Sequence, residues 1–98
     1  MKFFVLKGVE RIVGINNCEY QIYDVVDFHD SDNLYNQMRK YSYREFFQMG
    51  APARTMRHEV YYSEKNITLK DGRLLSHCDV FHHTHSYFMF VDAEDFKV

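Results

Sequence analysis

The sequence predicts an α+β fold: a small antiparallel β-sheet with one long amphipathic helix packed across it. A stretch from about Ser31 to Met49 repeats apolar residues with the period of a helix, and segments of alternating polarity lie on both sides of it. Lys70-Asp71-Gly72-Arg73 places an Asp-Gly pair where a type I′ hairpin turn requires it. A chain of 98 residues has room for one core, so we expect a single domain over 1–98.

The helix is the element with the clearest local signals. Asp30, Ser31 and Asp32 offer N-cap side chains and negative charge at the positive end of the helix dipole. Gly50 suits the left-handed position after the last turn, and Pro52 follows as a stop. At about 100° per residue, one arc of the helix gathers most of its apolar side chains, and we expect this arc to face the core. The arc contains Leu34, Tyr35, Met38, Tyr41, Phe46 and Met49.

Short strands are expected before and after the helix. Asp24 interrupts the apolar face of the second long strand, so it lies either at a bulge or with its carboxylate drawn inward. The segment 86–91 is apolar on both faces, which is typical of a central strand. The expected strands are 2–6, a short one within 8–14, 20–28, 57–63 and 66–69 around a Glu64-Lys65 turn, 74–81 and 86–91.

Composition favours a cytoplasmic protein that does not associate with membranes. Cys18 and Cys78 are far apart and form no C-x-x-C pair, which fits a reducing compartment. No apolar run approaches the roughly 20 residues of a membrane-spanning helix. The chain has 8 Tyr and 9 Phe and no Trp, more aromatic residues than one helix and a modest sheet require, so part of them is expected at a recognition surface.

The charge of the chain is unevenly distributed. Its formal net charge is −2, yet the segment from Arg39 to His58 holds five Lys or Arg residues and one acid, Glu45. That segment therefore carries +4 and the remainder −6, a distribution that steers a partner in one orientation. Cations and aromatic residues alternate at i, i+3, i+4 and i+7 on the side of the helix away from the expected core. This stripe consists of Lys40, Tyr43, Arg44 and Phe47, and Arg54 and Arg57 continue it.

The stripe has three interpretations. It docks on a protein partner, because Arg and aromatic residues are typical interface anchors. It binds single-stranded nucleic acid by stacking bases and neutralising phosphates. Or it packs beneath the chain that follows Pro52. We interpret the chain as a small non-enzymatic regulator or inhibitor that binds a protein, of the kind that phages and mobile elements carry against host machinery. A homodimer through an exposed edge strand or the stripe is a further alternative.

The histidines of the C-terminal part provide an enzymatic alternative. On an extended strand His83 and His85 point to one face about 7 Å apart, a spacing at which two imidazoles share a metal ion. His77 or Asp79 would supply a third ligand, so a transition metal such as zinc is the cofactor of this alternative, and none is expected otherwise. A metal-dependent or phosphodiester-acting enzyme would use this cluster. The competing interpretation is that these are polar side chains of a turn.

Two His-x-Ser/Thr triplets widen the enzymatic alternative. His29-Asp30-Ser31 and His82-His83-Thr84 each follow an apolar residue, and in this they resemble the paired motifs of the two-histidine phosphoesterases. The resemblance implies that the two imidazoles act as general acid and base across a phosphodiester. It requires His29 and His82 to lie close together. The chain is shorter than that family and lacks its internal duplication.

Overall fold

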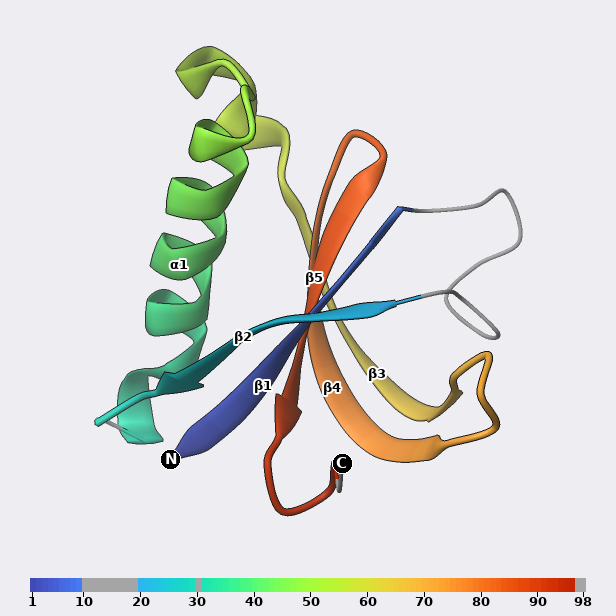
Figure 1. The fold of residues 1–98 in the computed structure, drawn as a ribbon. Coiled ribbons are helices and arrows are strands. Elements are labelled where there is room, and N and C mark those ends of the chain that lie inside the picture. The colour runs from blue at the N-terminus through green and yellow to red at the C-terminus, as the bar shows by residue number, and fades with distance from the viewer. Residues whose placement is uncertain (10–19, 30, 97–98) are drawn as a thin grey trace.

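The computed structural model describes residues 1–9, 20–29 and 31–96, which form a five-stranded sheet, one α-helix and two 3₁₀ helices (Figure 1). In chain order these are β1 (Lys2–Val9), β2 (Gln21–Asp27), η1 (Ser31–Asn33), α1 (Leu34–Gln48), η2 (Ala53–His58), β3 (Val60–Thr68), β4 (Leu74–His83) and β5 (Ser86–Asp92). The chain is therefore α+β, and α1 has 15 residues, fewer than the expected 31–49. Within the described ranges, no helix is long and apolar enough to cross a membrane.

The sheet has the order β2-β1-β5-β4-β3, and every neighbouring pair of strands is antiparallel. The central position of β5 confirms the prediction from its two apolar faces. β3 runs without interruption through Glu64 and Lys65, where a turn was expected, because both residues keep the register that pairs β3 with β4. The local irregularity is instead Asn66, whose φ of 58° is left-handed. Beyond Val9, the short strand expected within 8–14 lies outside the described residues.

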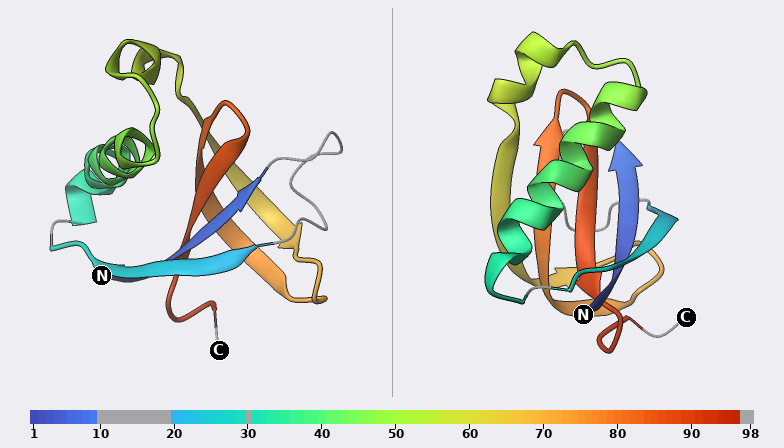
Figure 2. Two further views of the ribbon diagram at one scale, coloured as in Figure 1. Left: turned by 45° about the horizontal axis from the view of Figure 1, so that its top comes forward. Right: turned by 90° about the vertical axis from the view of Figure 1, so that its left-hand side faces the viewer.

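Both faces of the sheet bury apolar side chains. Figure 2 shows α1 lying across one face of a strongly twisted sheet. On that face the buried residues are Phe3, Val5, Phe28, Met38, Tyr41, Phe46, Met56, Phe81, Phe88 and Phe90. On the other face they are Leu6, Ile67, Leu69, Leu75, Cys78, Val80, Tyr87, Met89, Val91 and Phe96. The aromatic residues are thus concentrated beneath α1, where a few large rings fill a small core.

The end of α1 is formed as its sequence predicts. Gly50 has φ +100°, its N–H donates to Phe47 O, and Ala51 N–H donates to Phe46 O. These two bonds form a Schellman motif, which requires a left-handed residue and so favours glycine. The start of α1 differs from expectation: Asn33 is the N-cap and makes no side-chain cap hydrogen bond. Ser31 and Asp32 belong to the preceding η1, and Asp30 lies outside the described residues.

Fewer of the apolar residues of α1 are buried than the helical pattern predicts. Tyr35 and Met49 are 47% and 40% exposed, although the Tyr35 ring lies 4.8 Å from that of Tyr61 and 5.8 Å from that of Phe81 on the sheet. Ser42 and Glu45, which fall within the same arc, are buried. Helical periodicity thus identified the right side of the helix but not how deeply each residue on it is buried.

The sequence predicted a bulge at Asp24 and a turn between β3 and β4, and the structure corrects the type of that turn. The register of β1 and β2 shifts beside Asp24, which confirms the bulge, and the Asp24 carboxylate accepts hydrogen bonds from Tyr41 Oη and Val25 N–H, each 2.8 Å long. The β3–β4 turn lies at the expected residues. However, Gly72 N–H donates to Leu69 O and only Gly72 has a positive φ, +91°. This is a type I turn followed by a left-handed glycine, not a type I′ turn.

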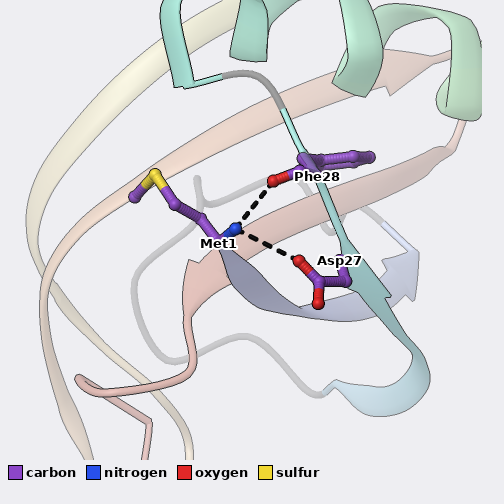
Figure 3. Close-up of polar contacts among 3 residues, drawn as sticks. All are labelled: Met1, Asp27 and Phe28. Carbon is purple, nitrogen blue, oxygen red and sulfur yellow. Dashed lines mark hydrogen bonds and ion pairs between the residues drawn. The ribbon is translucent and has the colours of Figure 1, made fainter.

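The amino group of Met1 connects the start of β1 to the end of β2. It donates hydrogen bonds to Asp27 Oδ1 at 3.1 Å and to Phe28 O at 2.7 Å (Figure 3). The hydrogen bond and the positive charge of the Met1 amino group lower the pKa of the Asp27 carboxyl. The start of β1 is therefore held against the end of β2.

Candidate partner-binding surface

The outer side of α1 presents an exposed phenylalanine between cations. Phe47 is 60% exposed, whereas its neighbour Phe46 is 1% exposed. Lys40 and Arg44 are four residues apart and so lie on the same face of α1. The Arg44 side chain is 61% exposed. Arg54 and Arg57, on η2, are exposed as well. We call these residues the cationic-aromatic surface: Lys40, Arg44, Phe47, Arg54 and Arg57.

The acids of this part of the chain are turned inward. Between Leu34 and Glu59 the only acidic residues are Glu45 and Glu59. The Glu45 side chain is 11% exposed, its Oε1 lies 3.7 Å from Arg44 Nη2, and its Oε2 is buried. Burial raises the pKa of Glu59 to about 7, and its Oε1 has no hydrogen-bond partner. The exposed surface of α1 and η2 therefore carries more positive charge than a count of the charged residues in the sequence indicates.

Tyr43 does not share the exposure of Phe47, although the helical spacing groups them. Tyr43 is half-buried and packs against the core under α1. Arg39 lies over its ring, with Cζ 4.5 Å from the ring centroid, and Arg39 Nη2 donates a 2.9 Å hydrogen bond to Tyr43 Oη. The predicted stripe therefore contains one open aromatic ring, that of Phe47.

The two ends of the molecule differ in charge. Figure 1 shows the C-terminal end of α1 and the following η2 at the top, and the N-terminus and the end of β5 at the bottom. Acids gather in the segments at the bottom: Asp27 at the end of β2, Asp32 in η1, and Asp92, Glu94 and Asp95 at and after the end of β5. The uneven charge of the sequence is thus also a charge difference between opposite ends of the fold, which can orient an approaching partner.

His83 anchors η2 to the sheet. It is 9% exposed, its ring lies 5.4 Å from that of Phe46, and its Nε2 is 3.0 Å from Thr55 Oγ1. The Thr55 hydroxyl also donates to Pro52 O at 2.8 Å, so it connects the His83 ring to the start of η2. With Met56 buried beside it, this bond fixes the segment that carries Arg54 and Arg57.

The three histidines proposed as metal ligands are not brought together. His77 is exposed on β4, His83 is buried under η2, and His85 is exposed in the turn after β4. The same-face spacing of His83 and His85 applies only within a strand, and β4 ends at His83, followed by Thr84 with φ 58°. Among the residues that the structure describes, no group of three or more His, Cys, Asp or Glu could hold a metal ion.

A polar cluster around His77 was not anticipated. Ser63 Oγ lies 2.7 Å from His77 Nε2, and Tyr61 Oη donates to Asp79 Oδ1 at 2.7 Å. Burial and this hydrogen bond raise the pKa of Tyr61 to about 12. Asp79 Oδ1 stands 4.0 Å from the same Nε2, whereas a nucleophile triad has its carboxylate at the opposite ring nitrogen, Nδ1. The cluster depends on the β3–β4 register, which no local sequence signal reveals.

The paired histidines of the phosphoesterase interpretation lie at opposite ends of the sheet. His82 pairs with Tyr87 at the start of β5, whereas His29 follows the end of β2, whose Asp27 pairs with Lys2. Lys2 precedes Phe3, the partner of Asp92 at the end of β5. Five residues of strand span about 17 Å, too far for two imidazoles to act on one phosphodiester. That interpretation is therefore wrong.

Comparison with models of known protein families, with curated proteins and with solved structures finds no significant match to the chain.

Proposed function

We propose that this chain is a small non-enzymatic regulator or inhibitor that binds a protein partner through the cationic-aromatic surface. The observation that carries the proposal is Phe47, a large apolar side chain left 60% exposed among cations on the outer side of a packed helix. An isolated exposed apolar residue is common on protein surfaces. Its position beside Arg44 and Lys40, on the most basic part of the chain, supports a recognition role.

The composition of the surface is that of an interface anchor. Aromatic and Arg side chains are enriched at interfaces and carry a large share of binding energy, whereas Lys serves mainly for steering. The inward orientation of Glu45 leaves Arg44 as the outer charge of that turn. The acidic end of the molecule would point away from an acidic partner, so the charge difference favours one docking orientation.

The proposal is tested by affinity capture from a lysate of the organism that encodes the chain, with matched variants. We expect one stoichiometric protein to be retained by the wild type and lost with Phe47→Ala and with Arg44→Glu. Two controls change exposed residues elsewhere: Leu74→Ala, at a side chain that is 66% exposed, and Lys65→Glu on β3. Both controls should retain the partner. Each variant should melt within about 3 °C of the wild type, as surface substitutions do.

Two results would contradict the proposal. One is a partner that Phe47→Ala and Arg44→Glu retain at wild-type level, which would place the interface elsewhere. The other is a loss of binding in all four variants alike, which would show that capture depends on general charge or hydrophobicity and not on this surface.

A further inference from the structure

We infer that the cationic-aromatic surface receives an acidic polypeptide segment with one apolar side chain that packs on Phe47. This inference rests on the proposed function and names the chemistry of the partner. Three features of the described residues carry it: the number of open rings, the spacing of the cations and the acidic opposite end.

The number of open rings argues against a nucleic acid. Binding of a single strand relies on successive bases that stack on successive aromatic side chains. The surface offers one such ring, because Arg39 covers Tyr43 at 4.5 Å and Arg44 covers Tyr41 at 5.1 Å. One ring suits a single apolar side chain of a peptide, which needs one pocket or contact rather than a platform.

The spacing of the cations matches separate carboxylates. Lys40 and Arg44 are one helical turn apart, about 6 Å along α1, and Phe47 follows about 4.5 Å further. Arg54 and Arg57 are about 6 Å apart along η2, since a 3₁₀ helix rises about 2 Å per residue. Phe47 shares the helix face of the first pair, and the second pair lies on η2, the element that follows α1. An acidic segment that also carries an apolar residue complements that pattern.

The Arg44 guanidinium has two neighbours within the chain and is still open to solvent. It lies over the ring of Tyr41, 3.7 Å from Glu45 Oε1, and its side chain is 61% exposed. The planar fork of a guanidinium fits a carboxylate in bidentate geometry. Arg44→Lys would keep the charge and lose the fork.

The acidic end limits how far a polyanion can extend over the molecule. Asp92, Glu94 and Asp95 lie away from the cationic-aromatic surface, at the opposite end of the sheet. A long phosphate backbone that continued past the surface toward that end would meet like charge. A short acidic segment ends before it.

The test is a titration of the ¹⁵N-labelled full chain, followed by NMR, with three probes. These are a glutamate-rich peptide with one central phenylalanine, the same peptide with serine in place of that phenylalanine, and single-stranded oligothymidylate of equal charge. We expect saturable amide shifts confined to 40–47 and 53–58 with the first peptide. The serine peptide should bind about tenfold more weakly, and oligothymidylate more weakly than the first peptide.

Variants connect these shifts to the named side chains. Phe47→Ala should weaken the phenylalanine peptide about tenfold and leave the serine peptide nearly unchanged, because only the first makes the apolar contact. Arg44→Lys should weaken both peptides, and Arg44→Glu should abolish both. Leu74→Ala is the folded control.

Other results would overturn the inference. Tighter binding of oligothymidylate, with an affinity that falls steeply with salt, would assign the surface to nucleic acid. Equal affinity of the two peptides would show that Phe47 makes no apolar contact. Absence of peptide shifts at millimolar concentration would reject an acidic segment. In that last case, a protein captured from lysate in a Phe47-dependent way would still support the proposed function, so the two failures are distinguishable.

Discussion

Phe46 and Phe47 are adjacent, chemically identical and in opposite environments. Phe46 is 1% exposed, with its ring 4.7 Å from that of Phe88 and 5.4 Å from that of His83. Phe47 is 60% exposed. A rotation of about 100° between neighbouring residues of a helix is enough to separate a core side chain from a surface one. Residue type alone therefore says little about burial in α1, and the outer phenylalanine is the one that needs a reason other than folding.

The charged residues of α1 and η2 show the same division. The cations Lys40, Arg44, Arg54 and Arg57 are exposed, whereas Glu45 and Glu59 each have a buried oxygen without a hydrogen-bond partner. A buried unpartnered carboxylate oxygen destabilises the fold. The arrangement leaves an outer surface free of acids, which suits an acidic partner. Four changes measure how far the inner and outer sides differ.

The largest effect is expected from Phe46→Ala. Removal of a buried aromatic ring loses its transfer free energy and leaves a cavity, so the free energy of unfolding should fall by about 3–5 kcal/mol. Urea denaturation followed by circular dichroism measures this. If the variant does not fold, Phe46→Leu should lose a smaller, measurable amount. A loss below about 1 kcal/mol for Phe46→Ala would contradict the burial of this ring.

A pH-dependent effect is expected from Glu59→Gln. Burial raises the pKa of Glu59 to about 7 in the folded chain, against an ordinary value of 4.5. The folded state thus keeps a proton that the unfolded state has lost between these values, so this residue makes the wild type less stable as pH rises from about 4.5 to about 7. Since the side chain is partly in water, we expect about 1–3 kcal/mol rather than the full value of the shift.

The measurement compares urea unfolding of the wild type and Glu59→Gln at pH 4, 6 and 8. The two should be similar at pH 4, and the glutamine variant should be the more stable at pH 8. The comparison within one pH cancels the opposite trend of carboxyls with a lowered pKa, such as Asp27 and Asp71. Glu94→Gln, at an exposed site, controls for the loss of one negative charge. Equal stability of wild type and Glu59→Gln at pH 8 would contradict this prediction.

A smaller effect is expected at the end of α1. Gly50 has φ +100° and open space around the position of a Cβ atom, so the alanine of Gly50→Ala would meet no neighbouring residue, and its cost is the backbone strain of an L-residue at this φ. An L-residue in that region loses about 1–2 kcal/mol, and Asn loses less than Ala. Thermal unfolding of Gly50→Ala and Gly50→Asn should therefore rank wild type, Asn, Ala. A variant with Ala that is as stable as the wild type would mean that the Schellman geometry is not needed.

Local signals were sufficient for part of the fold. The helix, its glycine end and the bulge at Asp24 each depend on a few neighbouring residues, and each was predicted. The exposure of Tyr35 and Met49 was missed because helical period shows the direction of a side chain but not how completely its neighbours cover it. The type of the β3–β4 turn was wrong because an Asp-Gly pair fits both a two-residue type I′ loop and the three-residue loop Lys70-Asp71-Gly72 that Leu69 and Arg73 close here.

The candidate surface was predicted in outline for the same reason. Lys40, Arg44 and Phe47 share a helix face, which spacing alone determines. The partial burial of Tyr43, which contacts Arg39, and the burial of Glu45 depend on tertiary packing that spacing does not contain. The Ser63–His77 contact depends on strand register across the β3–β4 hairpin, so it became visible only in the structure.

The smallest effect on stability is expected from Phe47→Ala, and it is the most informative of the four. An exposed side chain in the last turn of a helix contributes little to folding, so the free energy of unfolding should change by less than about 0.5 kcal/mol. Paired with Phe46→Ala under the same conditions, it gives a direct ratio between two identical substitutions one residue apart. A loss of several kcal/mol would show that Phe47 belongs to the core, and the cationic-aromatic surface would then lack its anchor. An unchanged stability is the result that the proposed recognition role of Phe47 requires.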